Sequence, residues 1–180
     1  MRLATLLLAV ATAALLAACG SVPAPKPDPK GDAAFVARLK VLCSKTPALA
    51  PIDPSASLAA IISAATDNNA TVTNFVYGPP VPRHNGQIER HGGLSVLTPK
   101  ISSTSPLVPP VAGAAEMLVD MSKWYGLIVK AATADGTRVV TPAAKRKEIK
   151  ALSEMAGTTV TRENQARSEL AKIGVTSCLT

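Results

Sequence analysis

The chain holds two histidines, and both lie in one short stretch with an acidic residue between them. His84 and His91 flank Glu89, and imidazole and carboxylate groups are zinc ligands, so a metal site can be drawn here. Zinc needs three or four convergent ligands, however, and a stretch rich in glycine and proline does not force these side chains together. Arg83 and Arg90, each beside a histidine, add positive charge that disfavours a cation. We therefore expect exposed loop histidines with no bound metal, haem or other cofactor.

Recognisable catalytic motifs are absent from the sequence. It has no G-x-S-x-G nucleophile turn, no H-E-x-x-H helix and no Gly-rich phosphate loop. Several carboxylates of the C-terminal half fall where helical spacing predicts solvent: Asp120, Glu148, Glu154, Glu163 and Glu169. The sequence therefore predicts a protein that is not an enzyme.

A group of cations lies near the start of a predicted helix: Lys145, Arg146, Lys147 and Lys150. Positive charge at a helix N-terminus opposes the helix dipole, so helix stability does not explain the group. One interpretation is a solvated helix face. The other is contact with phosphate or carboxylate groups of a lipid, an anionic polymer or an acidic partner. Nucleic acid is not an expected partner, because no exposed aromatic side chains accompany these cations to stack on bases.

Residues 1–19 have the layout of an exported precursor. Arg2 supplies a short positive region, and the apolar run from Leu3 to Leu16 is too short and too rich in small residues for a membrane span. The sequence Leu-Ala-Ala-Cys at residues 16–19 resembles the lipobox of bacterial lipoprotein precursors. An ordinary signal peptide, in which Cys19 is incidental to cleavage, is the alternative.

The lipoprotein resemblance implies that residues 1–18 are removed and that Cys19 is lipidated. In that family the matching cysteine carries a diacylglycerol, and its amine is commonly acylated, for example with palmitate. Each buried methylene contributes about 0.8 kcal/mol, so two or three chains attach a protein to the membrane permanently. Gly20 stands where an aspartate often retains such proteins in the inner membrane. The expected location is therefore the outer membrane, facing the periplasm.

Lipidation of Cys19 leaves two other cysteines, Cys43 and Cys178. An exported chain folds in an oxidising compartment, where cysteines pair. Neither residue belongs to a C-x-x-C motif or has a histidine nearby in sequence, which disfavours a redox or metal-binding role. We expect a disulfide that encloses nearly the whole domain, for which chain entropy gives on the order of 5 kcal/mol. Unpaired thiols are the alternative.

The mature chain has the length of one domain preceded by a tether. Residues 19–31 are rich in proline and predict an extended segment, and residues 32–180 predict a single domain. Aromatic residues make up only 3% of the chain, so the core must be aliphatic and would benefit from a disulfide. The formal net charge of +7 suits anionic neighbours.

Apolar residues at helical spacing predict two helices in the N-terminal half. Asp32 caps the first, and Thr46-Pro47 ends it. Its inward face is Phe35, Val36, Leu39, Leu42 and Cys43. Asp53-Pro54 begins the second helix, which ends near residues 67–69. The β-branched segment 71–77 fits either a short strand or a continuation of that helix.

Three further helices are expected in the C-terminal half. The longest runs from Ala112 to about Ala134 and carries a wide apolar stripe, typical of a central core helix. The stripe is Ala114, Leu118, Met121, Tyr125, Ile128 and Ala132, widened by Met117, Trp124 and Ala131. The fourth helix begins at Thr141-Pro142, turns Ile149, Leu152 and Ala156 inward, and stops at Gly157. The fifth follows Thr161, with Ala166, Leu170 and Ile173 inward and Lys172 and Gly174 at its end.

The segment Gly78–Pro110 separates these two groups of helices. Its prolines and glycines are too frequent for any long helix, and the sequence HNGQ at residues 84–87 is a hairpin signal with polar flanks. Structureless segments of this length are uncommon in compact domains unless they are functional or disordered. We expect this segment to add little to the core and to carry an interaction surface: Arg83, His84, Arg90 and His91.

The sequence thus predicts a mainly α protein, a small bundle of about five helices with a long Pro/Gly-rich insertion and room for one short hairpin. Its expected function is that of a lipid-anchored envelope lipoprotein, a non-enzymatic interaction or structural module for a protein partner or an anionic envelope polymer. A carrier of a small ligand, lipid or haem, with a cavity near Trp124, Tyr125 and Met121 is the first alternative. An envelope hydrolase is the second.

Overall fold

The computed structural model describes residues 28–83, 87–135 and 141–179. The lipobox with Cys19, most of the predicted tether and His84 lie outside these residues. The described part is mainly helical and contains one two-stranded sheet, which confirms the predicted fold class. None of its helices combines the length and the apolar character that a crossing of the bilayer needs.

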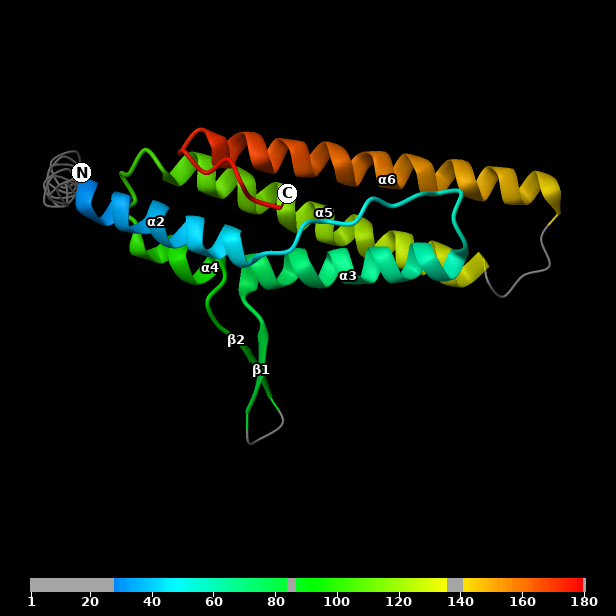
Figure 1. The fold of residues 1–180 in the computed structure, drawn as a ribbon, viewed down its shortest axis with the longest axis horizontal. Coiled ribbons are helices and arrows are strands. Elements are labelled where there is room, and N and C mark those ends of the chain that lie inside the picture. The colour runs from blue at the N-terminus through cyan, green and yellow to red at the C-terminus, as the bar shows by residue number, and fades with distance from the viewer. Residues whose placement is uncertain (1–27, 84–86, 136–140, 180) are drawn as a thin grey trace, which may run out of the picture.

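Three long helices form the body of the molecule (Figure 1). They are α3 (Leu58–Tyr77), α5 (Val108–Asp135) and α6 (Pro142–Ala171). The middle helix, α5, packs against both others and runs antiparallel to each of them. The shorter helix α2 (Pro29–Lys45) lies end to end with α3, beside α4 (Leu94–Leu97), at the end of the bundle where α5 begins.

The core is aliphatic and is centred on α5. The predicted stripe is buried along its whole length: Ala114, Leu118, Met121, Tyr125, Ile128 and Ala132. Leu39 of α2, Phe75 of α3 and Leu170 of α6 belong to the same buried cluster. The predicted inward faces of the first helix and of the last one are confirmed at Leu39 and Leu170.

Helix α2 begins earlier than the sequence indicated. Its first residue is Pro29, so residues 29–31 belong to the helix and not to the tether. Proline suits this position because the first amides of a helix need no intrahelical partner. Asp32 therefore lies in the first turn and is not the cap. The predicted end is confirmed, since α2 stops at Lys45 and the Thr46 hydroxyl donates to Leu42 O at 2.8 Å.

Helix α3 begins later than predicted. Its cap is Ser57, whose hydroxyl accepts from the Ala60 amide at 3.3 Å. Asp53 instead accepts hydrogen bonds from the Ser55 amide and hydroxyl, at 2.8 and 2.6 Å, in a turn before the helix. Prediction of the cap at Asp53-Pro54 was wrong because this local turn uses the carboxylate that a cap would need.

Helix α3 also continues to Tyr77 without a break at residues 67–69. Val72, Phe75 and Val76 are buried on the face that packs against the core. Burial of these side chains overrides the preference of β-branched residues for strands. Of the two readings of residues 71–77, the continued helix is therefore correct.

Helix α6 is one continuous helix of 30 residues, two more than α5, and is the longest in the described chain. The predicted stop at Gly157 and the predicted cap at Thr161 were wrong. The Thr161 hydroxyl donates to Gly157 O at 2.9 Å, a bond within the helix that removes its use as a cap. Ile149 is 36% exposed and does not face inward, whereas Leu152 and Ala156 are buried. The start at Thr141-Pro142 is confirmed.

The segment Gly78–Pro110 is more structured than expected. It contains the predicted hairpin, formed by β1 (Pro80–Pro82) and β2 (Ile88–Arg90), then α4 and the 3-10 helix η1 (Thr98–Lys100). Leu94 and Ile101 are buried in the core, so the expectation that this segment adds little to the core is wrong for its second half. Helix α5 also begins inside it, because prolines are tolerated in a first helical turn.

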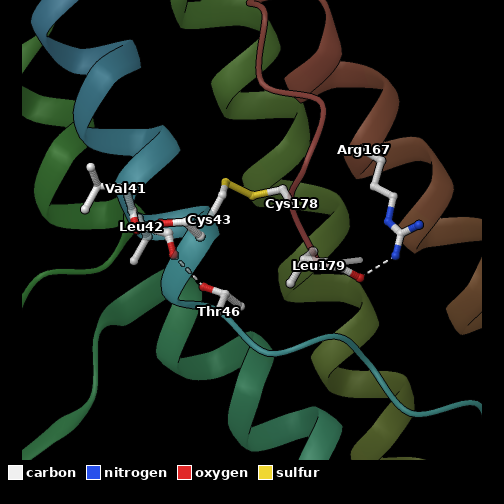
Figure 2. Close-up of a disulfide and its surroundings, with 8 residues drawn as sticks. Val41, Leu42, Cys43, Thr46, Arg167, Cys178 and Leu179 are labelled. Carbon is white, nitrogen blue, oxygen red and sulfur yellow. Dashed lines mark hydrogen bonds between the residues drawn. A yellow bond between two sulfur atoms is a disulfide. The ribbon is translucent and has the colours of Figure 1, made fainter.

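The C-terminal tail crosses from α6 to α2 and is tied there by a disulfide. Cys43 and Cys178, 135 residues apart, are joined with a Cα–Cα distance of 4.7 Å, and both are buried. This confirms the predicted pairing. Figure 2 shows Arg167 of α6 donating to Leu179 O beside the disulfide. The tail is therefore held at two adjacent residues, one covalently and one by an ionic side chain.

Candidate functional site

The β1–β2 hairpin stands out from the side of the helical bundle (Figure 1). Its strands are antiparallel, with Val81 opposite Glu89 and Pro82 opposite Ile88. The Arg83 amide donates to Gln87 O at 2.8 Å, so these two residues form a hydrogen-bonded pair. Because bonded and non-bonded pairs alternate in an antiparallel ladder, Val81 and Glu89 form the next bonded pair.

This alternation makes the two edges of the hairpin unequal. Pro80 and Pro82 occupy the positions of β1 whose amides would face away from β2. Proline has no backbone N–H group, and at these two positions no hydrogen bond to β2 is lost. The outer edge of β1 has no donors at these positions, which protects that edge from pairing with another strand. In β2, the amides and carbonyls of Ile88 and Arg90 face outward by the same alternation. The outer edge of β2 is thus the edge that can accept another strand.

The two faces of the hairpin also differ. One face carries charges, because Glu89 forms an ion pair with Arg83, and a Glu89 carboxylate oxygen lies 3.1 Å from His91 Nε2. The other face carries the two prolines of β1, Ile88, which is 69% exposed, and, at its base, Arg90 opposite Pro80. Ile88 and the prolines give this projecting element a small exposed apolar area.

The base of the hairpin is fixed to the end of α3. Arg90 donates to the side-chain oxygen of Asn74 at 3.0 Å and to Gly78 O at 2.9 Å. Gly78 has a φ of 87°, and a Cβ there would lie 2.0 Å from His91 O, so only glycine fits. Arg90, predicted as an interaction residue, is therefore used to position the hairpin, whereas Arg83 and His91 lie on its charged face.

A hollow of about 460 Å³ lies between the base of the hairpin and the end of α2. Its walls are mainly apolar and include Leu42, Phe75 and Pro79, with Lys45 and His91 also lining it. Such a hollow has the dimensions to accept one or two side chains of a partner.

The predicted group of cations at the start of α6 lies away from the hairpin. Arg146, Lys147 and Lys150 are exposed near the start of α6, and Lys150 Nζ lies 4.0 Å from a Glu154 oxygen. The side chain of Lys145 is outside the described atoms. Figure 1 places the start of α6 at the end of the molecule opposite to the first turn of α2, away from the hairpin. The structure therefore does not bring the two predicted groups of interaction residues together.

A second hollow, a groove of about 400 Å³, has Tyr125 of α5 among its lining residues. One of its walls is the strap, residues 46–57, which connects α2 to α3 and runs along the bundle (Figure 1). Its lining includes Leu49 and Ile52 from the strap, Tyr125 from α5, and Gly157 and Glu163 from α6. Trp124, near which a cavity was expected, is not among the lining residues.

Some of the groove-lining residues carry largely buried polar groups. The Tyr125 hydroxyl is hydrogen-bonded to Asn68 and Thr159, and burial, followed by the nearby Glu163 carboxylate, raises the pKa of Tyr125 to about 12. Burial also raises the pKa of the Glu163 carboxyl, and its ion pair with Arg167 lowers it in part. Sequence spacing placed Glu163 in solvent, but only 16% of its side chain is exposed. The buried positions of Asn68 and Thr159 carry no sequence signal, because both residue types are usually found at surfaces.

Within the described residues, no three histidine, cysteine, aspartate or glutamate side chains come close enough to hold a metal ion. No protein-family model matches the chain, and neither a curated protein nor a solved structure matches it.

Proposed function

We propose that this protein is a lipid-anchored lipoprotein of the bacterial cell envelope and acts as a non-enzymatic interaction module. The anchor is Cys19, and the preferred site is the periplasmic face of the outer membrane. The partner is an envelope protein, which contacts the β1–β2 hairpin. An anionic envelope polymer, bound at the cations of α6, is the second kind of partner that the chain suits.

The observation that carries this proposal is the hairpin itself. A two-stranded hairpin buries little of its own surface and is marginal in isolation, yet here Arg90 and the close contact at Gly78 hold it to α3. It presents an exposed Ile88, one strand edge blocked by prolines and one open edge. A fixed projection with these properties suits a partner that docks against it with an extended segment and an apolar side chain.

The lipid anchor is tested by Cys19→Ser. The variant should accumulate as an unprocessed precursor without acyl chains, because the thiol that accepts the diacylglycerol is missing. Metabolic labelling with a fatty-acid analogue and the mass of the intact protein report both effects. Normal processing and unchanged labelling would contradict the proposal.

The partner is tested by crosslinking in intact cells followed by purification of the tagged full-length protein. Ile88→Ser should reduce recovery of a defined crosslinked protein about tenfold, because it removes the apolar side chain most exposed on the hairpin. The control is Leu127→Ser, which removes an apolar side chain that is 45% exposed on α5. Equal recovery from the wild type and both variants would exclude the hairpin as the contact surface.

A further inference from the structure

The groove beside the strap is lined by apolar residues and by a few polar ones. Leu49, Ile52 and Val160 are apolar lining residues, and the largely buried side chains of Tyr125 and Glu163 contribute polar groups. A concave apolar surface with a few convergent polar groups is the usual form of a small-molecule site. Its volume of about 400 Å³ also lies in the range of such sites.

Gly157 is an independent sign that this groove has a use. It lies in the interior of α6, where glycine costs about 1 kcal/mol relative to alanine. Close packing does not require it, because, apart from its chain neighbours and the backbone of its own helix, no described atom lies within 4 Å of the position that its Cβ would take. Its effect is to leave the wall of the groove open on the α6 side. A larger residue there would favour the helix and fill the groove.

The charges around the groove restrict the head group of a ligand. Glu163 is the one charged residue among the described groove-lining residues, and its carboxylate is paired with Arg167. An anionic head would be repelled by Glu163. A cationic head would add a charge that the existing ion pair does not balance, in a partly buried position. A carboxylate accepts hydrogen bonds and does not donate them, so a neutral head that donates fits best.

We propose that the groove between the strap and α6 binds a neutral, mainly apolar small molecule whose hydroxyl or amide group donates a hydrogen bond to Glu163. The apolar part of the ligand lies along Leu49, Ile52 and Val160. This site is separate from the hairpin and does not depend on the proposed protein partner.

Photolabelling of the full-length lipidated protein in its membranes tests the proposal. The probe is an eight-carbon alcohol that carries a diazirine, and labelled residues are mapped by mass spectrometry. We expect labels on the strap and on α6 near residues 153–160, and we expect unlabelled 1-octanol to reduce them. The corresponding eight-carbon acid and amine should label these residues about tenfold less. Stronger labelling by the acid or by the amine would overturn the assignment of a neutral head.

The substitution Gly157→Leu tests whether the open groove is needed for labelling, and Gly126→Leu is its matched control. Gly126 is also inside a helix, and with the same exceptions no described atom lies within 4 Å of its Cβ position, but it is not a groove-lining residue. Both changes replace glycine with a better helix former, so both proteins should fold. Gly157→Leu should reduce labelling of the groove about tenfold, and Gly126→Leu should leave it unchanged. Undiminished labelling in Gly157→Leu would overturn the proposal, whatever the outcome at the hairpin.

Discussion

The side chain of Asn68 on α3 binds both backbone groups of Ala50 in the strap. Its Oδ1 accepts from the Ala50 amide at 2.9 Å, and its Nδ2 donates to Ala50 O at 2.8 Å. These bonds replace the backbone partners that the irregular strap lacks at this residue. Asn68 is also hydrogen-bonded to Tyr125. One buried amide thus joins the strap, α3 and α5 beside the groove.

We predict that Asn68→Ala lowers the free energy of unfolding by about 1–3 kcal/mol, because it leaves polar groups of the strap without partners. Asn164→Ala, a change at an exposed position of α6, is the control and should have little effect. Chemical denaturation measures the stability, and hydrogen exchange should show faster exchange at the Ala50 amide. Unchanged exchange there would mean that Asn68 does not hold the strap.

The disulfide between Cys43 and Cys178 should contribute more than any single hydrogen bond. Its loop spans 135 residues, for which the chain-entropy model gives on the order of 5 kcal/mol. We predict that Cys43→Ala and Cys178→Ala each lower the thermal midpoint strongly and by similar amounts, since each removes the same link. The double variant should resemble either single variant. Additive losses would show that packing of the two side chains, and not the link, is the main term.

The sequence predicted the elements whose signals are local and repetitive. The stripe from Ala114 to Ala132 follows helical spacing without interruption, and it is buried as expected. The errors arose where contacts between residues distant in sequence determine the secondary structure. Residues 67–77 look polar and then β-branched, but Asn68 turns inward to bind Ala50 and Phe75 packs in the core, so the helix continues. In the same way Gly157 looks like a helix stop in sequence, but the packing of α6 against α5 extends across it.

Among the candidate sites, too, those with a local signal in the sequence could be predicted, and those formed by residues distant in sequence could not be predicted in full. Arg83 and His91 were proposed as interaction residues from their place in a segment unsuited to helices, and the cysteine pair was predicted from the count of cysteines on the expectation that the chain is exported. The groove could be predicted only in part: of the residues expected beside a cavity, Tyr125 lines it, whereas Trp124 and Met121 do not. Its polar groups come from residues 68, 125, 159 and 163, which only the folding of three helices and a strap brings together.

Tyr125 should make the stability of the protein sensitive to alkaline pH. Its pKa is raised to about 12 in the folded protein from 10.0, the ordinary value for tyrosine. The stabilisation is complete below pH 10.0 and is lost as pH rises through about 12, because the unfolded chain ionises more readily. We predict that Tyr125→Phe is less stable than the wild type near neutral pH, having lost its hydrogen bonds, and that the difference narrows above pH 10.0. Denaturation across this range measures it, and a constant difference would contradict the assignment.

Arg90 should control how firmly the hairpin is held. Its guanidinium donates to Asn74 and to Gly78 O, which joins the hairpin to the last turn of α3. We predict that Arg90→Ala increases hydrogen exchange at the β1–β2 amides and speeds limited proteolysis at Arg83, while the global unfolding free energy changes little.

Arg83→Ala is the matched change for the exchange measurement, because its ion pair with Glu89 is half exposed and such pairs contribute little. It should leave exchange in the rest of the hairpin close to that of the wild type. If Arg90→Ala and Arg83→Ala behave alike, the hairpin is held by its own strand pairing and by the backbone contact at Gly78. If Arg90→Ala alone frees the hairpin, capture of the proposed protein partner should weaken with it, because a mobile hairpin must be ordered again on binding.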